Sequence, residues 1–426
     1  MRIVAPKVNS LQDPPAPVPQ PGRTRLAAAV GAATAGVSRR LGRGSGSVIG
    51  GRAVLLVDPR ALERLSAGRT IALVSGTNGK TTTTSLLAAA LGGPGWVDTN
   101  LLGANLIPGL VAALAAGSPE RPAVLEVDEA WLARVVDATR PQAVALLNLS
   151  RDQLDRNNEV RTLANLWRRT FESHPEVTVV ANADDPLVVW GAGRAGTVRW
   201  VGAGQPWKDD AGGCPQCGGR IDFDDSGSGW RCGDCDLQRP ALDVRMEGAE
   251  VVWAGGPSVV PELHLPGRAN RANAAMALAT AEALGTAPSV SAPALGSLRE
   301  VVGRYAVVDA GGHRARLLLA KNPAGWLEVF DFLGPAPTPV VIAINARIAD
   351  GRDPSWLWDV PFERLRGRFV VATGERSRDL AVRLHYAEVD HVREPDLARV
   401  VAAGRAPDVD VVANYTSFQQ LRGLLA

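Results

Sequence analysis

IALVSGTNGKTTTTS, residues 71–85, is the stretch from which the rest of the chain can be interpreted. Residues 71–74 are all apolar and indicate a buried strand, and the Ala/Leu-rich run after Thr82 indicates a helix. Gly76 and Gly79 leave the intervening backbone free to bend around an anion, and N–H groups at a helix start bind negative charge. Strand, glycine loop and helix in this order therefore predict a phosphate-binding site.

The side chains that follow the loop predict that its ligand is a nucleotide with Mg²⁺. A lysine at position 80 would contact the β- and γ-phosphates, and a hydroxyl at position 81 would bind the metal. The usual pattern has glycine six residues before the lysine, where this chain has Val74, so the loop is an offset variant. A chance Gly-Lys-Thr in a loop is the alternative, but it leaves the flanking strand and helix unexplained. We expect the nucleotide to be bound by Gly76, Thr77, Asn78, Gly79, Lys80, Thr81 and Thr82.

Length, charge and composition narrow the class of protein. A chain of 426 residues predicts two or three domains. Its formal net charge of +2 gives no indication of a large basic surface that would bind nucleic acid or an anionic membrane. Residues 1–23 are rich in proline and polar residues without an apolar signal-peptide core, so we expect a disordered tail. The Ala/Gly-rich run 26–37 is too short to span a bilayer, so we expect a soluble cytoplasmic protein.

All four cysteines of the chain lie in two Cys-x-x-Cys pairs within residues 205–240. Cys214 and Cys217 are separated from Cys232 and Cys235 by fourteen residues, which is typical of a zinc ribbon. Four thiolates close the coordination sphere, so we expect a structural zinc ion, with two disulfides as the alternative. With the thiols bound to zinc, the chain would have no cysteine nucleophile.

Three further apolar runs predict strands that end in polar residues. Residues 122–130 contain a short buried strand followed by carboxylates, of which Glu126 is the most credible Mg²⁺ ligand and a solvated acidic turn is the alternative. Residues 143–147 lead to Asn148, and residues 177–180 lead to the segment 182–186, Asn-Ala-Asp-Asp-Pro. Strands alternating with helices predict an α/β fold with a doubly wound parallel sheet, whose site lies at the carboxyl ends of the strands.

The local sequence also predicts the secondary structure of three further segments. The period of apolar residues predicts an amphipathic helix over residues 102–114. Within residues 39–65 we expect a Gly/Ser-rich loop packed near the nucleotide, then a short strand and a helix. Residues 287–297, APSVSAPALGS, are typical of an interdomain linker.

Five motifs in sequence order resemble the central ATP-binding domain of the Mur ligases. They are GTNGKTTT (76–83), Glu126, NLSRDQLDR (148–156), NADDP (182–186) and PGRANRANAAMALA (266–279). Mur ligases activate a carboxylate with ATP as an acyl phosphate, which an amine then attacks. The resemblance implies a central domain over residues 24–296 and a smaller Rossmann-like domain over 297–426. It also implies that Asn148 lies beside the nucleotide and, with Asp152 and Gln153, lines the metal side of the site.

Three departures from the ordinary ligases point to a narrower group. Residues 152–155 read Asp-Gln-Leu-Asp where Mur ligases commonly have a histidine, the lysine that is carbamylated in many ligases has no good match, and a zinc ribbon is inserted. All three are shared by the MurT subunits of lipid II isoglutaminyl synthase, which the chain closely resembles. That group amidates D-glutamate in the stem peptide of lipid II, using ammonia from a GatD-type glutaminase subunit, at the inner face of the cell membrane.

The resemblance also implies roles for residues after position 297. Arg304 in VVGRY would reach the γ-phosphate, and Asn322 in AKNPAGW would face the nucleotide together with Lys321. Family members are thought to lend one aspartate to the histidine of the glutaminase. We expect Asp353 in this role, with Asp350 and Asp359 as alternatives. The sequence DGRD, residues 350–353, could instead be a surface turn without a function.

Three other functions compete with this interpretation. The first is an amino-acid-adding ligase of the Mur or folylpolyglutamate type, which would need a distinct amino-terminal substrate domain, but only about fifty residues lie between the expected tail and the strand that begins at Ile71. The second is a zinc-dependent nucleic-acid-binding protein, which the near-neutral charge disfavours. The third is a non-catalytic scaffold for the glutaminase, which the intact Lys80, Thr81 and Glu126 disfavour.

Overall fold

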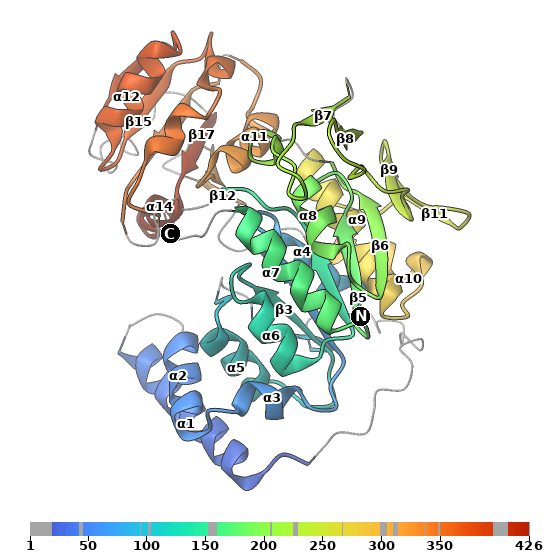
Figure 1. Cartoon of the computed structure of the whole chain (residues 1–426). Coiled ribbons are helices and arrows are strands. Elements are labelled where there is room, and N and C mark those ends of the chain that lie inside the picture. Colours follow the sequence, from blue (N-terminus) through green and yellow to red (C-terminus); the bar gives the residue numbers. More distant parts are fainter. Residues whose placement is uncertain are drawn as a thin grey trace. The chain divides into compact units, whose positions relative to one another are not determined.

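The computed structural model describes most of the chain, in two compact units. It covers residues 19–41, 46–93, 95–100, 104–151, 160–204, 207–224, 229–265, 267–298, 305–309, 314–336, 338–347, 350–394 and 408–425. The first unit takes in residues up to 149, 160–265 and 269–299, and the second takes in 150–159, 266–268 and 300–426, as far as these are described (Figure 1). Each unit is considered by itself.

Within its described residues, the first unit is organised around a nine-stranded sheet in the order β11-β10-β9-β6-β5-β4-β1-β3-β2. From β2 to β9 in this order the strands run parallel, and β10 and β11 are antiparallel at one edge. The predicted doubly wound parallel sheet is therefore confirmed. The strands are β1 (Ile71–Ser75), β2 (Asp98–Thr99), β3 (Ala123–Val127), β4 (Ala143–Leu146), β5 (Thr178–Asn182), β6 (Thr197–Gly202), β9 (Val244–Glu247), β10 (Glu250–Trp253) and β11 (Ser258–Val259).

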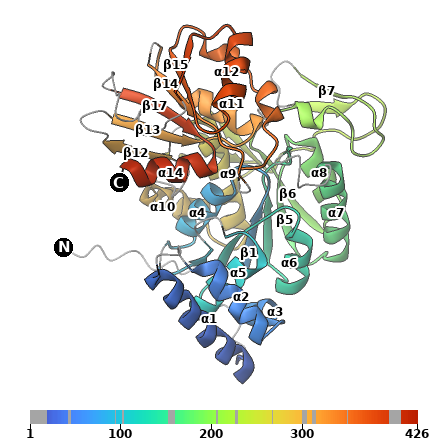
Figure 2. The same ribbon diagram turned by 90° about the vertical axis from the view of Figure 1, so that its left-hand side faces the viewer.

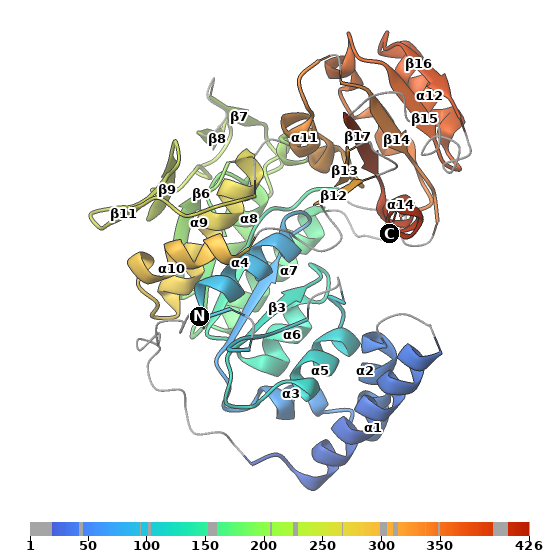
Figure 3. The same ribbon diagram turned by 180° about the vertical axis from the view of Figure 1, so that it is seen from behind.

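Helices cover both faces of this sheet, which explains why its central strands are apolar throughout. Figures 1 and 3 view the molecule from opposite sides. They show α6 (Leu132–Thr139) and α7 (Val160–Ser173) over one face, and α4 (Lys80–Ala90), α9 (Arg268–Ala283) and α10 (Pro288–Ala294) over the other. Ile71 and Leu73 of β1 pack in a core with residues of α6 and α7, and β1 is buried along its whole length.

The register of the central strands brings the predicted site residues to one edge. Val74 of β1 lies opposite Glu126 of β3, and Ser75 lies opposite Leu146 of β4. Because these strands are parallel, the loop after β1, the end of β3 and Asn148 after β4 emerge together at the carboxyl edge of the sheet.

The amino-terminal helices differ from the sequence prediction. α1 (Gly22–Arg40) begins inside the predicted tail, and the expected short strand is replaced by α2 (Ser47–Val57), followed by α3 (Ala61–Ser66). Residues 42–45 of the expected Gly/Ser-rich loop lie outside the described part of the chain. α1 and α2 lie side by side (Figure 2). A Cβ atom on Gly51 of α2 would lie 1.7 Å from the carbonyl oxygen of Pro108, so this glycine permits close helix packing instead of marking a loop.

Two more local predictions need correction. The helix expected over 102–114 begins at Ile107 and continues to Ala116 as α5, with Pro108 in its first turn. Residues 101–103 lie outside the described part of the chain. The predicted linker 287–297 is largely helical, because Pro288–Ala294 forms α10 and Leu295–Ser297 forms a 3-10 turn. Ser291, Ala292 and Leu295 are buried, so this segment packs on the first unit.

A small hairpin interrupts the first unit between β6 and β9. β7 (Ile221–Phe223) and β8 (Trp230–Cys232) pair antiparallel as a separate two-stranded sheet. Ile221 and Trp230 pack with Cys214, Cys232 and Val189 in a small core of their own. Val189 belongs to α8 (Pro186–Ala192), so the hairpin is attached to the helix that follows the Asn-Ala-Asp-Asp-Pro segment.

The second unit contains a mostly parallel sheet in the order β12-β13-β17-β14-β15-β16. Only β12 is antiparallel to its neighbour among these described strands. Trp326 and Phe362 pack edge to face with ring centroids 4.9 Å apart in its core. The elements are β12 (Tyr305–Asp309), β13 (Arg314–Leu319), α11 (Pro323–Phe332), β14 (Val340–Ala343), β15 (Val370–Thr373), α12 (Ser377–Tyr386), β16 (His391–Arg393), β17 (Asp408–Ala413) and α14 (Tyr415–Leu425), with 3-10 turns at Ser355–Trp358 and Phe362–Leu365.

Candidate active site

The loop after β1 has the backbone geometry of an anion-binding turn. Gly76 has φ +141° and Gly79 has φ +83°, values that side chains strongly disfavour. A Cβ on Gly76 would lie 2.9 Å from the backbone N and O of Asn148, and one on Gly79 would lie 2.6 Å from Oδ1 of Asn273. No side chain caps the start of α4, so its first N–H groups remain directed at the loop. These features fit a bound phosphate.

Asn148 holds the loop in this shape. Its Oδ1 accepts a hydrogen bond from the N–H of Asn78 at 2.9 Å, and its Nδ2 donates to the Asn78 carbonyl at 3.1 Å. The N–H of Thr77 donates to the Asn148 carbonyl at 2.9 Å. Asn148 therefore contacts the phosphate loop, defined here as residues 76–79, along its backbone.

Lys80 is buried at the first position of α4 and donates to three oxygens. Its Nζ lies 2.5 Å from the Gly76 carbonyl, 3.2 Å from the Thr77 carbonyl and 3.0 Å from Oε2 of Glu129. Lys80 and Glu129 are 4 % and 3 % exposed, so they form a buried ion pair. Such a pair is stable only when its remaining polar atoms are also bonded, and the two carbonyls meet that need for the ammonium group.

Thr81 and Glu126 place oxygen ligands beside the loop. The Thr81 hydroxyl donates to Oε2 of Glu126 at 2.8 Å, and both residues are buried. Asn100 fixes the backbone of Glu126 from both sides, accepting from its N–H at 2.7 Å and donating to its carbonyl at 2.8 Å. Hydroxyl and carboxylate oxygens are suitable ligands for Mg²⁺, so this pair fits the metal predicted from sequence. Thr82 is buried in the first turn of α4.

The candidate residues of the second unit have different environments. Asn322 is buried and caps α11, because its Oδ1 accepts from the N–H of Gly325 at 2.8 Å. Asp350 is also buried and binds the N–H of Thr416 at 2.8 Å as well as the Thr416 hydroxyl. Asp353 and Asp359 are exposed, and Asp353 accepts from the N–H of Ser355 at 2.9 Å. Of the three aspartates, Asp350 is therefore the one whose carboxylate is buried and hydrogen-bonded within the second unit.

Some predicted site residues lie outside the described residues. These are Arg304 and the segment 152–159, which contains Asp152 and Gln153. Their predicted roles remain predictions.

The four cysteines converge on one point. Their Sγ atoms all lie within 4.8 Å of one another, with Cys214 to Cys235 at 3.6 Å and Cys217 to Cys232 at 3.5 Å. Tetrahedral Zn–S bonds of about 2.3 Å place sulfurs about 3.8 Å apart, so the arrangement fits one metal ion. The cysteines are free of disulfides, and backbone N–H groups of Gly219 and Asp234 donate to Cys217 and Cys232 at 3.4 Å.

The cysteine hairpin, residues 207–239 as far as described, is fastened to the end of β5. Arg239 pairs with the buried carboxylate of Asp184 at 2.6 Å, and Nε1 of Trp230 donates to the Ala183 carbonyl at 2.9 Å. Asn182 in the same segment donates to the Leu147 carbonyl at 2.9 Å. The hairpin is thus joined by direct hydrogen bonds to the segment that borders Asn148.

Asp185 completes this segment as the amino-terminal cap of α8. Its carboxylate accepts from the N–H groups of Leu187, Val188 and Leu149. Burial raises the pKa of Asp185 to about 6, and these three N–H donors act in the opposite direction.

Comparison with known proteins assigns both parts of the chain. Residues 74–205 match the Mur ligase middle domain, and residues 319–418 match the MurT ligase C-terminal domain. The lipid II isoglutaminyl synthase (glutamine-hydrolyzing) subunit MurT of Streptococcus pneumoniae is 30 % identical over 95 % of this chain and 97 % of that protein. This chain belongs to the MurT family. The subunit of the same name from Staphylococcus aureus (strain N315) is 28 % identical, over 89 % of this chain and 92 % of that one.

Solved structures support the fold of this MurT family member. A pseudomurein peptide ligase type C from Methanothermus fervidus superimposes with a TM-score of 0.66 at 17 % identity, covering 84 % of this chain and 78 % of that one. The fold is therefore that of the Mur ligases, as the sequence motifs predicted. In the described part of this MurT chain, no helix combines the length and the apolar character needed to cross a membrane.

Sequence reasoning missed one residue of this MurT site, Glu129. The segment after β3 was interpreted with Glu126 as its functional carboxylate, and Glu129 was treated as one of two acidic neighbours. Both Glu126 and Glu129 are buried, and they contact Thr81 and Lys80 respectively. No local pattern in the sequence signals the contact between Glu129 and Lys80, because the two residues are 49 positions apart.

Proposed function

We propose that this chain is an ATP-dependent synthetase that amidates the α-carboxylate of D-glutamate in the lipid II stem peptide, forming D-isoglutamine for peptidoglycan synthesis. The observation that carries the proposal is the buried group of Lys80, Thr81 and Glu126 at an uncapped helix start. This group of residues occurs in a chain that is similar, across both units, to the lipid II isoglutaminyl synthase subunit MurT of Streptococcus pneumoniae.

The reaction needs the carboxylate to be activated before ammonia can displace an oxygen. A carboxylate oxygen attacks the γ-phosphorus of ATP, giving an acyl phosphate and ADP, and ammonia then attacks the acyl carbon and releases inorganic phosphate. Lys80 would orient the β- and γ-phosphates, and the loop N–H groups would stabilise the charge that develops on them. Arg304 would offset charge on the transferred phosphoryl group.

Thr81 and Glu126 would hold Mg²⁺, and their mutual hydrogen bond at 2.8 Å keeps both oxygens on one side of the loop. When bound, the ion supplies positive charge that neutralises the phosphate oxygens. Asn148 would act by fixing the loop backbone, while Asn322 would face the nucleotide from the second unit.

Ammonia would come from a second polypeptide, a glutaminase of the GatD type. Free ammonia is almost wholly protonated at neutral pH, so a local supply from glutamine is needed, and that requires an activated nucleophile such as cysteine. Asp353 is exposed and would orient the histidine of the partner, as an aspartate does in a triad. Asp359 is the second candidate, because Asp350 is buried and bonded to Thr416.

The four cysteines would hold a structural zinc ion. Four thiolates leave no open coordination position, and the ion would fix the hairpin that is fastened to Asp184. Residues 24–296 would form the ATP-binding domain and residues 297–426 the partner-binding domain. The chain would work in the cytoplasm at the inner membrane face, where its lipid-linked substrate lies.

Replacement of Lys80 tests the proposal. We expect Lys80→Ala, purified with the glutaminase, to lose ATP-dependent amidation of lipid II, because the β- and γ-phosphates lose their buried cation, while both subunits still co-purify. Mass spectrometry of the lipid II product measures this directly. Lys208→Ala, which removes an amine from the cysteine hairpin, is the matched control. Amidation by Lys80→Ala at the wild-type rate would contradict the proposed site.

A further inference from the structure

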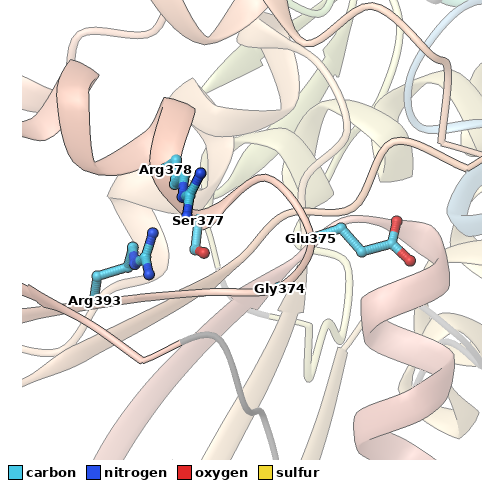
Figure 4. A pocket seen from close by; sticks show the side chains of 5 residues that line it. All are labelled: Gly374, Glu375, Ser377, Arg378 and Arg393. Carbon is cyan, nitrogen blue, oxygen red and sulfur yellow. The ribbon is translucent and has the colours of Figure 1, made fainter.

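A cavity of about 450 Å³ lies in the second unit, and none of the residues that line it was given a role above. Gly374, Glu375, Ser377, Arg378 and Arg393 line it (Figure 4). These residues come from the end of β15, the start of α12 and the end of β16. The carboxyl edge of a parallel sheet is the usual place for a ligand in an α/β unit, so this cavity has the location of a binding site.

The start of α12 gives the cavity a positive end. α12 has ten residues and no side-chain cap, so the N–H groups of its first turn carry partial positive charge, although Asp379 in the same turn offsets part of it. Gly374 makes the tight turn into the helix with φ +88°, and a Cβ there would lie 2.6 Å from the Ile344 carbonyl oxygen. A helix start alone does not identify a ligand, so further observations are needed.

Ser377 supplies the second observation. It is 3 % exposed, its side chain lines the cavity, and its hydroxyl points into the space between Arg393 and Glu375 in Figure 4. Within the described part of the chain, this hydroxyl has no hydrogen-bond partner. Because the rest of the residue is buried, this hydroxyl is available only from the cavity, where it can bond to an acceptor atom of a ligand.

Two arginines converge on the same space from different elements. Arg378 is in the first turn of α12, and Arg393 ends β16. Neither forms an ion pair with another described residue, although the neighbouring Arg376 is paired with Asp379 at 3.1 Å. A guanidinium group presents several N–H donors in a plane and matches the oxygens of a phosphate better than an ammonium group does.

Glu375 is the one carboxylate among the described residues that line the cavity, and an arginine outside the cavity neutralises it. Glu375 lies 2.6 Å from Arg347, and in Figure 4 its carboxylate extends away from both lining arginines. The charge facing the cavity therefore comes from Arg378, Arg393 and the helix start, and it is positive.

We propose that this cavity is a phosphoryl-binding site, in which Ser377, Arg378, Arg393 and the first N–H groups of α12 bind the oxygens of a phosphate or diphosphate. Donors that converge from two separate elements, α12 and β16, favour a tetrahedral anion over a planar carboxylate. Two sources share this chemistry: the diphosphate of a lipid-linked substrate, which rests on the proposed function, and free inorganic phosphate, which does not. The site itself depends only on the second unit.

Binding to the full-length chain tests the site without requiring turnover. The phosphate loop is first filled with a non-hydrolysable ATP analogue and Mg²⁺, and inorganic phosphate, pyrophosphate and a soluble short-chain prenyl diphosphate are then titrated by calorimetry. We expect Arg378→Ala and Arg393→Ala each to weaken binding about tenfold, since each removes a charge-assisted hydrogen bond. Arg366→Ala removes the same charge at the opposite end of β15, where Arg366 pairs with Glu388, and should leave binding unchanged.

A second variant separates lost binding from lost folding. Ser377→Asp places a carboxylate in the cavity and at the first turn of α12, where negative charge stabilises a helix. It should abolish binding while the thermal unfolding temperature is kept. Tighter binding of the prenyl diphosphate assigns the site to a lipid-linked ligand, and tighter binding of inorganic phosphate assigns it to the free anion. The site would be overturned if no phosphoryl compound bound, if acetate bound equally well, or if these variants bound like the wild type.

Discussion

Replacing Glu129 with glutamine should tighten nucleotide binding, whereas the same replacement at Glu126 should weaken it. Glu129 is paired with Lys80, the lysine that we expect to contact the phosphates, so an incoming triphosphate must compete with this carboxylate for the lysine. Glu126 instead bonds to Thr81, where a carboxylate would serve the metal ion of the nucleotide. The two glutamates therefore have opposite effects although both changes remove one negative charge.

The structure sets the size of the effect at Glu129. Lys80 Nζ lies 3.0 Å from Oε2 of Glu129, with both residues almost fully buried. A hydrogen bond between charged groups stabilises by about 1.5–3 kcal/mol, and a neutral acceptor in the same place gives about 0.5–1.5 kcal/mol. Glutamine should therefore destabilise the nucleotide-free protein by about 1–2 kcal/mol. If the phosphates bind Lys80 in place of Glu129, the nucleotide complex does not suffer this destabilisation. The affinity of the variant for the nucleotide then rises about 5- to 30-fold.

This reasoning is tested by two measurements, each made on three proteins: the wild type, the Glu129→Gln variant and the Glu126→Gln variant. Calorimetry with a non-hydrolysable ATP analogue and Mg²⁺ gives the dissociation constants. Thermal unfolding should show that Glu129→Gln is less stable than the wild type without nucleotide and approaches it when nucleotide is bound. Weaker nucleotide binding by Glu129→Gln, with unchanged stability of the free protein, would refute competition and show that Glu129 serves the bound state.

Three further outcomes are expected. Asp353→Asn should depress glutamine-driven amidation in the complex and spare amidation driven by added ammonium salts; an equal fall in both rates would exclude a role toward the partner's histidine. Arg239→Ala leaves the Asp184 carboxylate without its cation and should lower the free energy of unfolding by about 2 kcal/mol, with Arg231→Ala on the same hairpin as the neutral control. The pKa of Asp185 is raised by burial from 3.8 to about 6, so the folded state binds its proton more tightly and this contribution to stability is lost as pH rises through about 6. Denaturant unfolding at pH 5 and pH 7.5 should show a loss of about 1.4 kcal/mol from this group in the wild type and a smaller loss in Asp185→Asn, whereas equal losses in the two proteins would disprove the assignment.

The phosphate loop was predictable because its chemistry is local. Gly76, Gly79, Lys80 and Thr81 are set by the backbone path from β1 into α4, and sequence order alone gives that path. The approach of Thr81 to Glu126 needed one more step, the parallel pairing of β1 with β3, which the apolar runs indicated. The cysteine cluster was predictable for the same reason, since four thiols with ribbon spacing have few other arrangements.

The failed predictions concern residues whose role depends on distant packing. Gly50 and Gly51 are turn signals locally, yet in α2 they let backbones approach: a Cβ on Gly50 would lie 2.9 Å from the Gly31 carbonyl oxygen of α1. The linker prediction failed because small residues and prolines near 290 pack as α10 on the first unit. Glu129 was missed because its partner is 49 positions away in the sequence, and no local pattern records that pairing.

The position of the cysteines bears on why an amidating chain of this kind would need a second subunit. The sequence contains four cysteines, and all four Sγ atoms lie within 4.8 Å of one another. A thiolate that is bound to a metal in a closed site is not available to attack the carboxamide of glutamine. If zinc occupies this cluster, the chain can activate a carboxylate but has no thiol with which to release ammonia. The same hairpin is bonded to Asp184 and so supports the segment beside Asn148, so with zinc bound the cysteines would serve the structure of the first unit and not act as nucleophiles.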